Sequence, residues 1–281
     1  MSKITNNVSK HHNPFNLIFA IEFWERFGYY TLQTLLTYFM VDGLGYSEAK
    51  SFQVFGAFFA LAYGFSFAGG YIGDKILGIK RTMIIGAELL AIGYLLISIG
   101  KNEMVFLGLG FICIGSGIFK PNPANLLAIY YNINKEKDPH AGFTLYYMAI
   151  NIGSIFATLI APLIAQYFNY SIAFLGAAIG LTIVLTTLYF YYPIISHLSN
   201  ITGKKQPNML HLNLVIIFCV FSAILATNLI KHILLAKIFV WSMALISIII
   251  YFKYTITAKK QFKIGFIFVG LMCFEVWMCF I

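Results

Sequence analysis

The stretch IEFWERFGYY, residues 21–30, places charged side chains inside an otherwise apolar segment that runs from about residue 15 to residue 41. A helix needs about 20 residues to cross the hydrocarbon core of a bilayer, so Glu22, Glu25 and Arg26 are expected at membrane depth. A charge there costs about 2.5–3.5 kcal/mol on translocon-insertion scales. Each of these side chains must therefore pair inside the protein, face water or take up a proton.

Helical spacing gathers the polar residues of this segment on one face. Glu22, Arg26, Tyr29, Tyr30 and Gln33 fall at i, i+4, i+7, i+8 and i+11. The acid lies one turn before the arginine, which is the better orientation for an ion pair along a helix. Two carboxylates that share one guanidinium leave one acid under-compensated and able to take up a proton. The stripe predicts a surface for proton handling and ligand binding, while a purely structural ion pair between helices remains the alternative.

The composition indicates an integral membrane protein. Hydrophobic residues make up 60% of the chain and charged residues 10%, and the mean hydropathy is +0.81; a soluble domain has roughly a quarter of its residues charged. The four cysteines lie in apolar runs without metal-ligand spacing, so we expect buried thiols and neither disulfides nor a metal site. The polar start of the chain is not followed by a short cleavable apolar region, so the first helix is expected to be retained.

The apolar runs predict an all-α membrane protein whose last span is still running at residue 281. The net charge of +9 arises largely from basic residues in short loops, which indicates membrane topology and no nucleic-acid partner. Their distribution predicts a cytoplasmic N-terminus. The expected spans are residues 15–41, 51–72, 82–99, 104–118 with a broken continuation to 131, 142–167, 172–192, 210–230, 234–254 and 262 onward.

The second span ends in small residues followed by a charged turn. Gly69 and Gly73 allow another helix to approach closely. Asp74, Lys75 and Arg81 then form a short charged segment. We predict that these three residues act as a breakable latch, or gate, between helix ends; a solvated basic loop is the simpler alternative.

The fourth span contains a lysine beside two prolines. Lys120 follows a long apolar run and precedes Pro121, with Pro123 two residues later. Proline removes a backbone donor, so the helix is expected to bend or open at this point. An interrupted helix at membrane depth is tolerated where it lines a cavity. The lysine therefore either faces such a cavity or extends along its own stem to the membrane surface.

Three further polar residues lie in apolar surroundings. Tyr63 in the second span is expected to point its hydroxyl into the bundle, or only to pack. Asn151 in the fifth span needs a hydrogen-bond partner, which is either another helix or a ligand. Glu88 in the third span has no evident companion and receives no role.

Four motifs together resemble those of the proton-dependent oligopeptide transporter family within the major facilitator superfamily. The first-helix signature ExxERFxYY is present at residues 22–30, and GGxxADRxxG at residues 69–78, with Gly for Ala and Lys for Arg. FKPN is present at residues 119–122, and FxLYYxxINxGS at residues 143–154. Four motifs in this order are highly specific for the family.

The resemblance implies proton-coupled symport of di- and tripeptides by alternating access. It also implies a six-helix major facilitator-type half at residues 1–192, a two-helix linker at 193–260 and the start of a second half at 261–281. Proton coupling would rest on Glu22, Glu25, Arg26 and Lys120. The peptide would be bound by Arg26, Tyr29, Tyr30, Tyr63, Lys120 and Asn151.

The remaining expectations concern cofactors, partners and location. No cofactor is expected besides the coupling proton; the partners are a di- or tripeptide, membrane lipid and a C-terminal half that this chain lacks. Glu275 resembles a pocket acid of the seventh family helix without a secure alignment. The sequence contains no Ser-His-Asp set, His-x-x-x-His pair or phosphate-binding glycine loop. It therefore gives no indication of an enzyme. The location implied is a bacterial inner membrane, and the alternative function is a non-transporting fragment or membrane partner that needs a separately encoded second half.

Overall fold

The computed structural model describes residues 14–133, 139–191, 209–232, 234–239, 241–242, 245 and 249. All regular structure in these residues is helical, which confirms the predicted all-α class. The predicted span from residue 262, Glu275 and about half of the span at 234–254 lie outside the described residues.

The predicted spans agree with the helices to within a few residues. Six helices in the described part of the chain are long and apolar enough to cross a membrane, and the first helix, with its three charged residues, precedes them. Short π-helical turns, η1 (Phe39–Gly43) and η2 (Ile72–Ile76), extend the first two helices. The helices are α2 (Pro14–Tyr38), α3 (Glu48–Tyr71), α4 (Ile79–Ser98), α5 (Asn102–Phe119), α6 (Pro121–Ile133), α7 (Pro139–Tyr167), α8 (Tyr170–Phe190) and α10 (Met209–Lys231).

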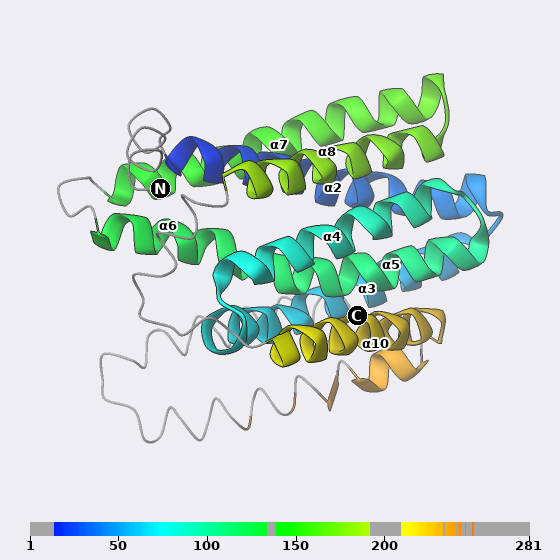
Figure 1. The fold of residues 1–281 in the computed structure, drawn as a ribbon. Helices are drawn as coiled ribbons and strands as arrows, with labels where there is room; N and C mark the ends of the chain where they lie inside the picture. The colour runs from blue at the N-terminus through cyan, green and yellow to red at the C-terminus, as the bar shows by residue number, and fades with distance from the viewer. Residues whose placement is uncertain are drawn as a thin grey trace.

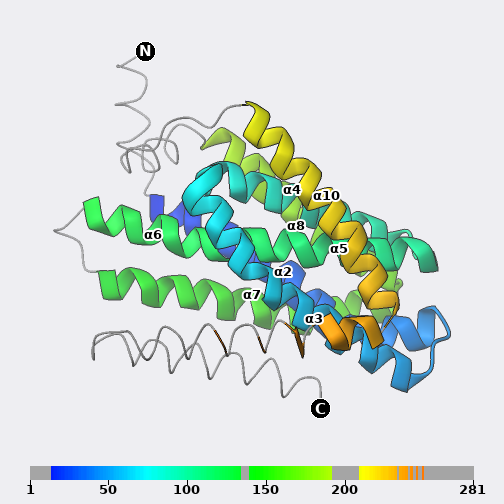
Figure 2. The same ribbon diagram turned by 90° about the horizontal axis from the view of Figure 1, so that it is seen from below.

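The helices run side by side as a bundle (Figure 1). α2 packs against α7 and α8, α4 packs between α5 and α8, and α5 packs against α3. Helices that are neighbours in sequence are thus not always neighbours in space, because α2 makes far more contact with α7 than with α3. Figure 2 shows α10 crossing the face of α5 beside α3. The first helix of the predicted linker therefore lies directly on the bundle.

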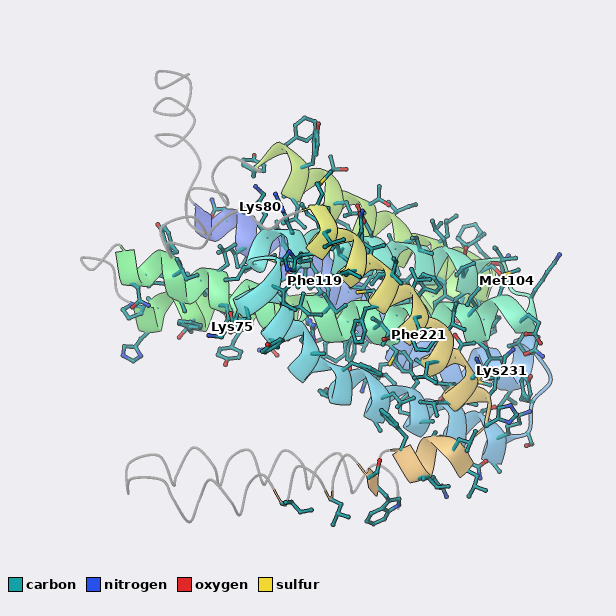
Figure 3. All side chains as sticks on the ribbon, turned by 60° about the horizontal axis from the view of Figure 1, so that its bottom comes forward. Lys75, Lys80, Met104, Phe119, Phe221 and Lys231 are labelled. Atoms are coloured by element: carbon teal, nitrogen blue, oxygen red, sulfur yellow. The ribbon has the colours of Figure 1, made fainter. Side chains whose placement is uncertain are left out.

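The turns lie at two opposite ends of the bundle, as expected for successive membrane crossings. Lys75 and Lys80, around the α3–α4 turn, lie at one end, and Met104 and Lys231 lie at the other (Figure 3). At this second end the hydroxyl of Tyr46 donates to Asn102, at 2.7 Å. Polar contacts between turns thus tie the ends of different helices together.

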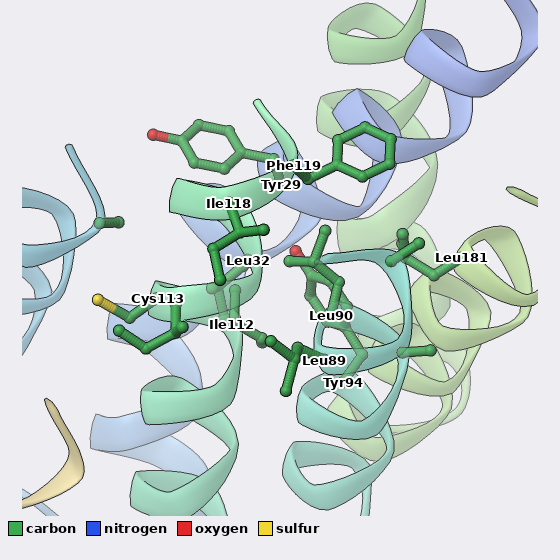
Figure 4. Close-up of a cluster of buried hydrophobic side chains, with 14 of the residues drawn as sticks. Tyr29, Leu32, Leu89, Leu90, Tyr94, Ile112, Cys113, Ile118, Phe119 and Leu181 are labelled. Atoms are coloured by element: carbon green, nitrogen blue, oxygen red, sulfur yellow. The ribbon is translucent and has the colours of Figure 1, made fainter. Parts of the chain in front are cut away.

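Buried apolar side chains fill the centre of the bundle. Lipid tails are as apolar as these side chains, so close packing holds membrane helices together rather than removal from water. Cys113 is buried here as a free thiol, as predicted, and Cys219 is a second buried thiol. Figure 4 shows one such cluster, in which α4 and α5 contribute Leu89, Leu90, Tyr94, Ile112, Cys113, Ile118 and Phe119.

Small residues let α3 and α5 approach closely, as the sequence predicts. A Cβ on Gly69 would overlap the carbonyl oxygen of Gly117 and would lie 2.6 Å from the Cα of Ile118. Both obstacles are backbone atoms, which cannot move without shifting a helix. Gly70 is different, because the nearest atom to a Cβ there is 4.0 Å away, on Pro121.

Gly69→Ala is therefore expected to lower the free energy of unfolding by about 1–3 kcal/mol, because it forces α3 and α5 apart. Gly70→Ala is the matched control and is expected to change it by less than about 0.5 kcal/mol. Unfolding of the purified chain by SDS in mixed micelles measures both. Equal effects of the two substitutions would contradict the close approach at Gly69.

The predicted break in the fourth span is present but is smaller than expected. α5 ends at Phe119 and α6 begins at Pro121, so the interruption is one residue long. Lys120 keeps helical dihedral angles (φ −50°, ψ −43°), and its N–H still donates to the carbonyl of Ser116 at 2.9 Å. The side-chain amide of Asn122 donates to the carbonyl of Ile118 at 2.7 Å. These bonds hold the two helical segments together, so the chain does not unwind here.

Candidate functional site

The predicted charged cluster on α2 is assembled and buried. Glu22, Glu25 and Arg26 are 3%, 1% and 4% exposed. The guanidinium Nε of Arg26 lies 3.1 Å from a carboxylate oxygen of Glu22 and also donates to the carboxylate of Glu25. One arginine thus pairs with two acids, which is the arrangement expected from the sequence.

One donor of the arginine is poorly aligned with its partner. Its Nη2 touches the carboxylate of Glu25, but it finds no hydrogen-bond acceptor in good geometry among the described residues. Buried donors without acceptors are uncommon because each one costs free energy. Arg26 is therefore able to accept a further anionic partner.

Tyrosines connect the cluster to Lys120. The guanidinium carbon of Arg26 lies 5.1 Å from the ring centroid of Tyr29, and the ammonium nitrogen of Lys120 lies 5.2 Å from the same centroid. The lysine also lies 4.0 Å from the ring centroid of Tyr63. The hydroxyls of Tyr29 and Tyr63 are 3.3 Å apart. The two cations predicted for one site thus share one aromatic ring.

The position of Lys120 bears on the two sequence-based alternatives, because its ammonium group lies against two tyrosine rings. Cation–π contacts within about 6 Å are attractive, and they hold this ammonium group against Tyr63 and Tyr29. The side chain therefore does not extend along its stem to the membrane surface.

Tyr30 packs beside the cluster, whereas Asn151 lies on an exposed face of α7. Tyr30 is half-buried, and its ring packs edge-on against that of Tyr29, with the ring centroids 5.5 Å apart. Asn151 is exposed on α7. α7 lies close to α2 at this level, because a Cβ on Gly153 would lie 2.7 Å from the carbonyl oxygen of Phe23. The amide of Asn151 is thus available to a ligand or to another helix.

The predicted latch residues lie apart from the charged cluster. Asp74 and Lys75 are exposed on η2, and Arg81 is half-buried near the start of α4. This places them at the end of the bundle where α3 turns into α4, and their predicted gating role stays a prediction. Glu88 is exposed on α4.

Sequence reasoning missed one member of the cluster, Tyr146. It is 6% exposed, and its hydroxyl hydrogen-bonds to the carboxylate of Glu22. A signal for it existed, because small residues recur along α7 in helical register with this tyrosine. They form the buried face of the helix, made of Gly142, Tyr146, Ala149, Gly153, Ala157 and Ala161.

Tyr146→Phe is expected to lower the free energy of unfolding by about 1–3 kcal/mol, because it leaves a buried carboxylate without its hydroxyl donor. The neighbouring Tyr147 is 60% exposed, so Tyr147→Phe is the matched control and should have little effect. SDS titration in mixed micelles compares the two. A larger loss for the control would contradict the assigned orientation of α7.

Comparison with known proteins gives a consistent set of relatives. The family model PTR2, described as the POT family, matches residues 80–279. Dipeptide and tripeptide permease B of Photorhabdus asymbiotica is 40% identical over 256 residues, which cover 90% of this chain and 51% of that protein. Dipeptide and tripeptide permease A of Chromobacterium violaceum is 34% identical over 279 residues, which cover 98% of this chain and 56% of that protein.

Solved structures give the same result for the fold. The chain resembles tetrameric PepTSo2 with a TM-score of 0.79 and 33% identity, over 90% of this chain and 56% of that one. A bacterial homologue of the human drug peptide transporters PepT1 and PepT2 gives a TM-score of 0.76 and 32% identity, over 83% of this chain and 54% of that one. The predicted major facilitator-type fold is thereby confirmed. The chain spans about half the length of the curated relatives it matches.

Proposed function

The chain belongs to the POT family, and on that premise we propose that it forms the proton-coupling and peptide-binding half of a membrane carrier for di- and tripeptides. The observation that carries the proposal is the buried series of contacts from Glu22 through Arg26 and Tyr29 to Lys120. This arrangement offers acids to a proton and two cations to a carboxylate, all within one site.

The proton would bind at the paired acids. Glu22 and Glu25 share the single guanidinium of Arg26, so neither carboxylate has a full positive charge to itself. Adding a proton to one acid removes the charge imbalance at little electrostatic cost. No other coupling ion and no bound cofactor are proposed.

The peptide would bind through its carboxylate. Arg26 Nη2 contacts Glu25 without forming a hydrogen bond among the described residues, and Lys120 lies 5.2 Å from the centroid of the same Tyr29 ring that Arg26 approaches. Protonation of one acid weakens its hold on Arg26, which is then free to bind the peptide carboxylate. Tyr30, Tyr63 and Asn151 would supply neutral polar contacts along the peptide backbone.

We further propose a cytoplasmic N-terminus in a bacterial inner membrane, with the α3–α4 turn on the cytoplasmic side. The excess of basic residues near that turn supports this orientation. Asp74, Lys75 and Arg81 would then act as a gate that opens and closes toward the cytoplasm. We propose transport and no catalytic reaction for this chain.

The test is uptake of a labelled dipeptide into vesicles under an imposed inward proton gradient. The vesicles hold the chain alone or the chain together with the C-terminal half of a related permease. The proposal predicts accumulation above the outside concentration in at least the second arm. No accumulation in either arm, with the chain shown to be in the membrane, would refute it.

Glu22→Gln and Glu25→Gln are each expected to abolish this accumulation, because a glutamine cannot take up the coupling proton. Glu103→Gln is the matched control: its side chain is 75% exposed in the first turn of α5, where it pairs with Lys231, and uptake should not change. Accumulation retained in both glutamine variants would exclude these acids from proton coupling.

A second candidate function follows from length. Because the chain spans about half of its relatives, it also fits a membrane partner that does not transport by itself and pairs with a separately encoded second half. Accumulation only in the two-component arm favours this second function, and accumulation by the chain alone excludes it.

A further inference from the structure

One buried hydroxyl close to the charged cluster has no hydrogen-bond partner. Tyr94, on α4, is 1% exposed, and its hydroxyl makes no hydrogen bond to any described residue. Such a group costs free energy in the folded state, because water has been removed and nothing replaces it. A phenylalanine would fill the same space without that cost.

The ring of Tyr94 lies directly against α2. Gly28 makes this possible, because a Cβ there would lie only 3.2 and 3.4 Å from the Cε2 and Cζ atoms of the ring. Gly28 is one helical turn after Glu25, on the same side of α2. In Figure 4 the hydroxyl of Tyr94 points toward the end of the cluster where Tyr29 is labelled. Glu25 comes one turn before Tyr29 in the sequence of α2. Glu25 and Arg26 are close enough for their charges to act on this hydroxyl.

The Tyr94 hydroxyl has no acceptor at Glu25 while that carboxylate is paired with Arg26. Both Nε and Nη2 of Arg26 contact its carboxylate, so a further donor is not needed while that ion pair is closed. The situation changes when the arginine leaves. A carboxylate that is 1% exposed would then have lost its cation, and it needs either a proton or a new donor.

We propose that Tyr94 is a positioning residue that donates a hydrogen bond to the carboxylate of Glu25 when Arg26 releases it. The inference rests on the proposed function, in which Arg26 turns from an acid to the peptide carboxylate. A glutamate side chain has enough rotatable bonds to bring its carboxylate toward Tyr94, and the tyrosine ring stays fixed against Gly28. The hydroxyl thus stabilises the Glu25 carboxylate when Arg26 has released it. It contributes no stability while the ion pair between Arg26 and Glu25 is intact.

The test compares Tyr94→Phe in two backgrounds, using the full chain in mixed micelles and its unfolding equilibrium in SDS. In the parent the substitution should leave the unfolding constant unchanged or lower it, because the lost hydroxyl was unsatisfied. In the Arg26→Gln background, where Glu25 has lost its cation, it should raise the constant by about tenfold or more. Equal effects in the two backgrounds would overturn the proposal.

Two further variants keep this result interpretable. If Arg26→Gln fails to fold, Arg26→Met provides the released background, because methionine keeps an unbranched side chain but carries no cation for Glu25. Tyr189→Phe is the control for loss of a hydroxyl: this side chain is 76% exposed on α8, and its replacement should have the same small effect in both backgrounds.

The comparison of Tyr94→Phe in the two backgrounds measures stability and does not depend on transport. Its outcome is therefore separate from that of the proposed function. Where uptake is measurable, Tyr94→Phe should lower the maximal rate several-fold at an unchanged half-saturating peptide concentration, since the residue does not touch peptide. A changed half-saturating concentration with an unchanged maximal rate would contradict the positioning role. Absence of uptake in both arms of the transport test would refute the transport proposal and would leave the unfolding result to decide on Tyr94.

Discussion

Arg26→Ala is expected to lower the free energy of unfolding by about 3–5 kcal/mol, since it leaves two buried acids without their shared cation. Glu22 and Glu25 are 3% and 1% exposed, so water cannot replace the guanidinium. Burial makes the removal of one partner far more costly than it would be at a surface, where ion pairs contribute roughly 0–1 kcal/mol. SDS titration of the purified chain measures the loss.

A second substitution separates charge from packing. If the unpaired negative charges of Glu22 and Glu25 cause the loss of stability, then adding Glu25→Gln to Arg26→Ala should recover part of it. The second substitution removes one of those two charges. The exposed Lys101→Ala is the matched control and should stay within about 0.5 kcal/mol of the parent. A small loss for Arg26→Ala, or no recovery in the double variant, would mean that the cluster is not a closed ion-pair network.

Lys120→Gln is expected to raise the dipeptide concentration for half-maximal uptake by about 10- to 100-fold. A hydrogen bond to a charged group contributes about 1.5–3 kcal/mol, and each 1.4 kcal/mol corresponds to tenfold. The glutamine keeps a polar side chain of similar length, but it removes the charge that lies against Tyr63 and Tyr29. Uptake at a series of dipeptide concentrations measures the change.

The matched control for this prediction is Lys101→Gln, which removes a lysine from the exposed turn between α4 and α5. It should leave the half-maximal concentration unchanged. If Lys120→Gln also left the half-maximal dipeptide concentration unchanged, Lys120 would not bind the peptide. Its role would then be limited to packing on the tyrosines.

Much of the fold was predictable because the membrane imposes a length on every span. The predicted edges of α2, α4, α7 and α10 lie within about four residues of the observed ones. The cluster on α2 was predictable for a related reason, since charges at membrane depth must find partners and helical spacing allows Glu22 and Arg26 to pair.

What the sequence left undetermined is the rotation of each helix about its axis. Tyr146 and Tyr147 are adjacent, and only packing of α7 against α2 decides that the first faces Glu22 while the second is exposed. Tyr94 was missed because its neighbour α2 is distant in sequence. The sequence analysis overestimated the break at Lys120. It considered the backbone donor that proline removes, but not the side-chain amide of Asn122, which donates to the carbonyl of Ile118.

The central claim is that one site, centred on the buried charges of α2, carries both the proton and the peptide. The most direct measurement is the internal pH of vesicles that hold the chain with the C-terminal half of a related permease, followed with a trapped dye as dipeptide is added outside at equal pH. The account predicts that dipeptide acidifies the interior with the parent chain and not with Glu22→Gln. Entry of labelled dipeptide without acidification would contradict it.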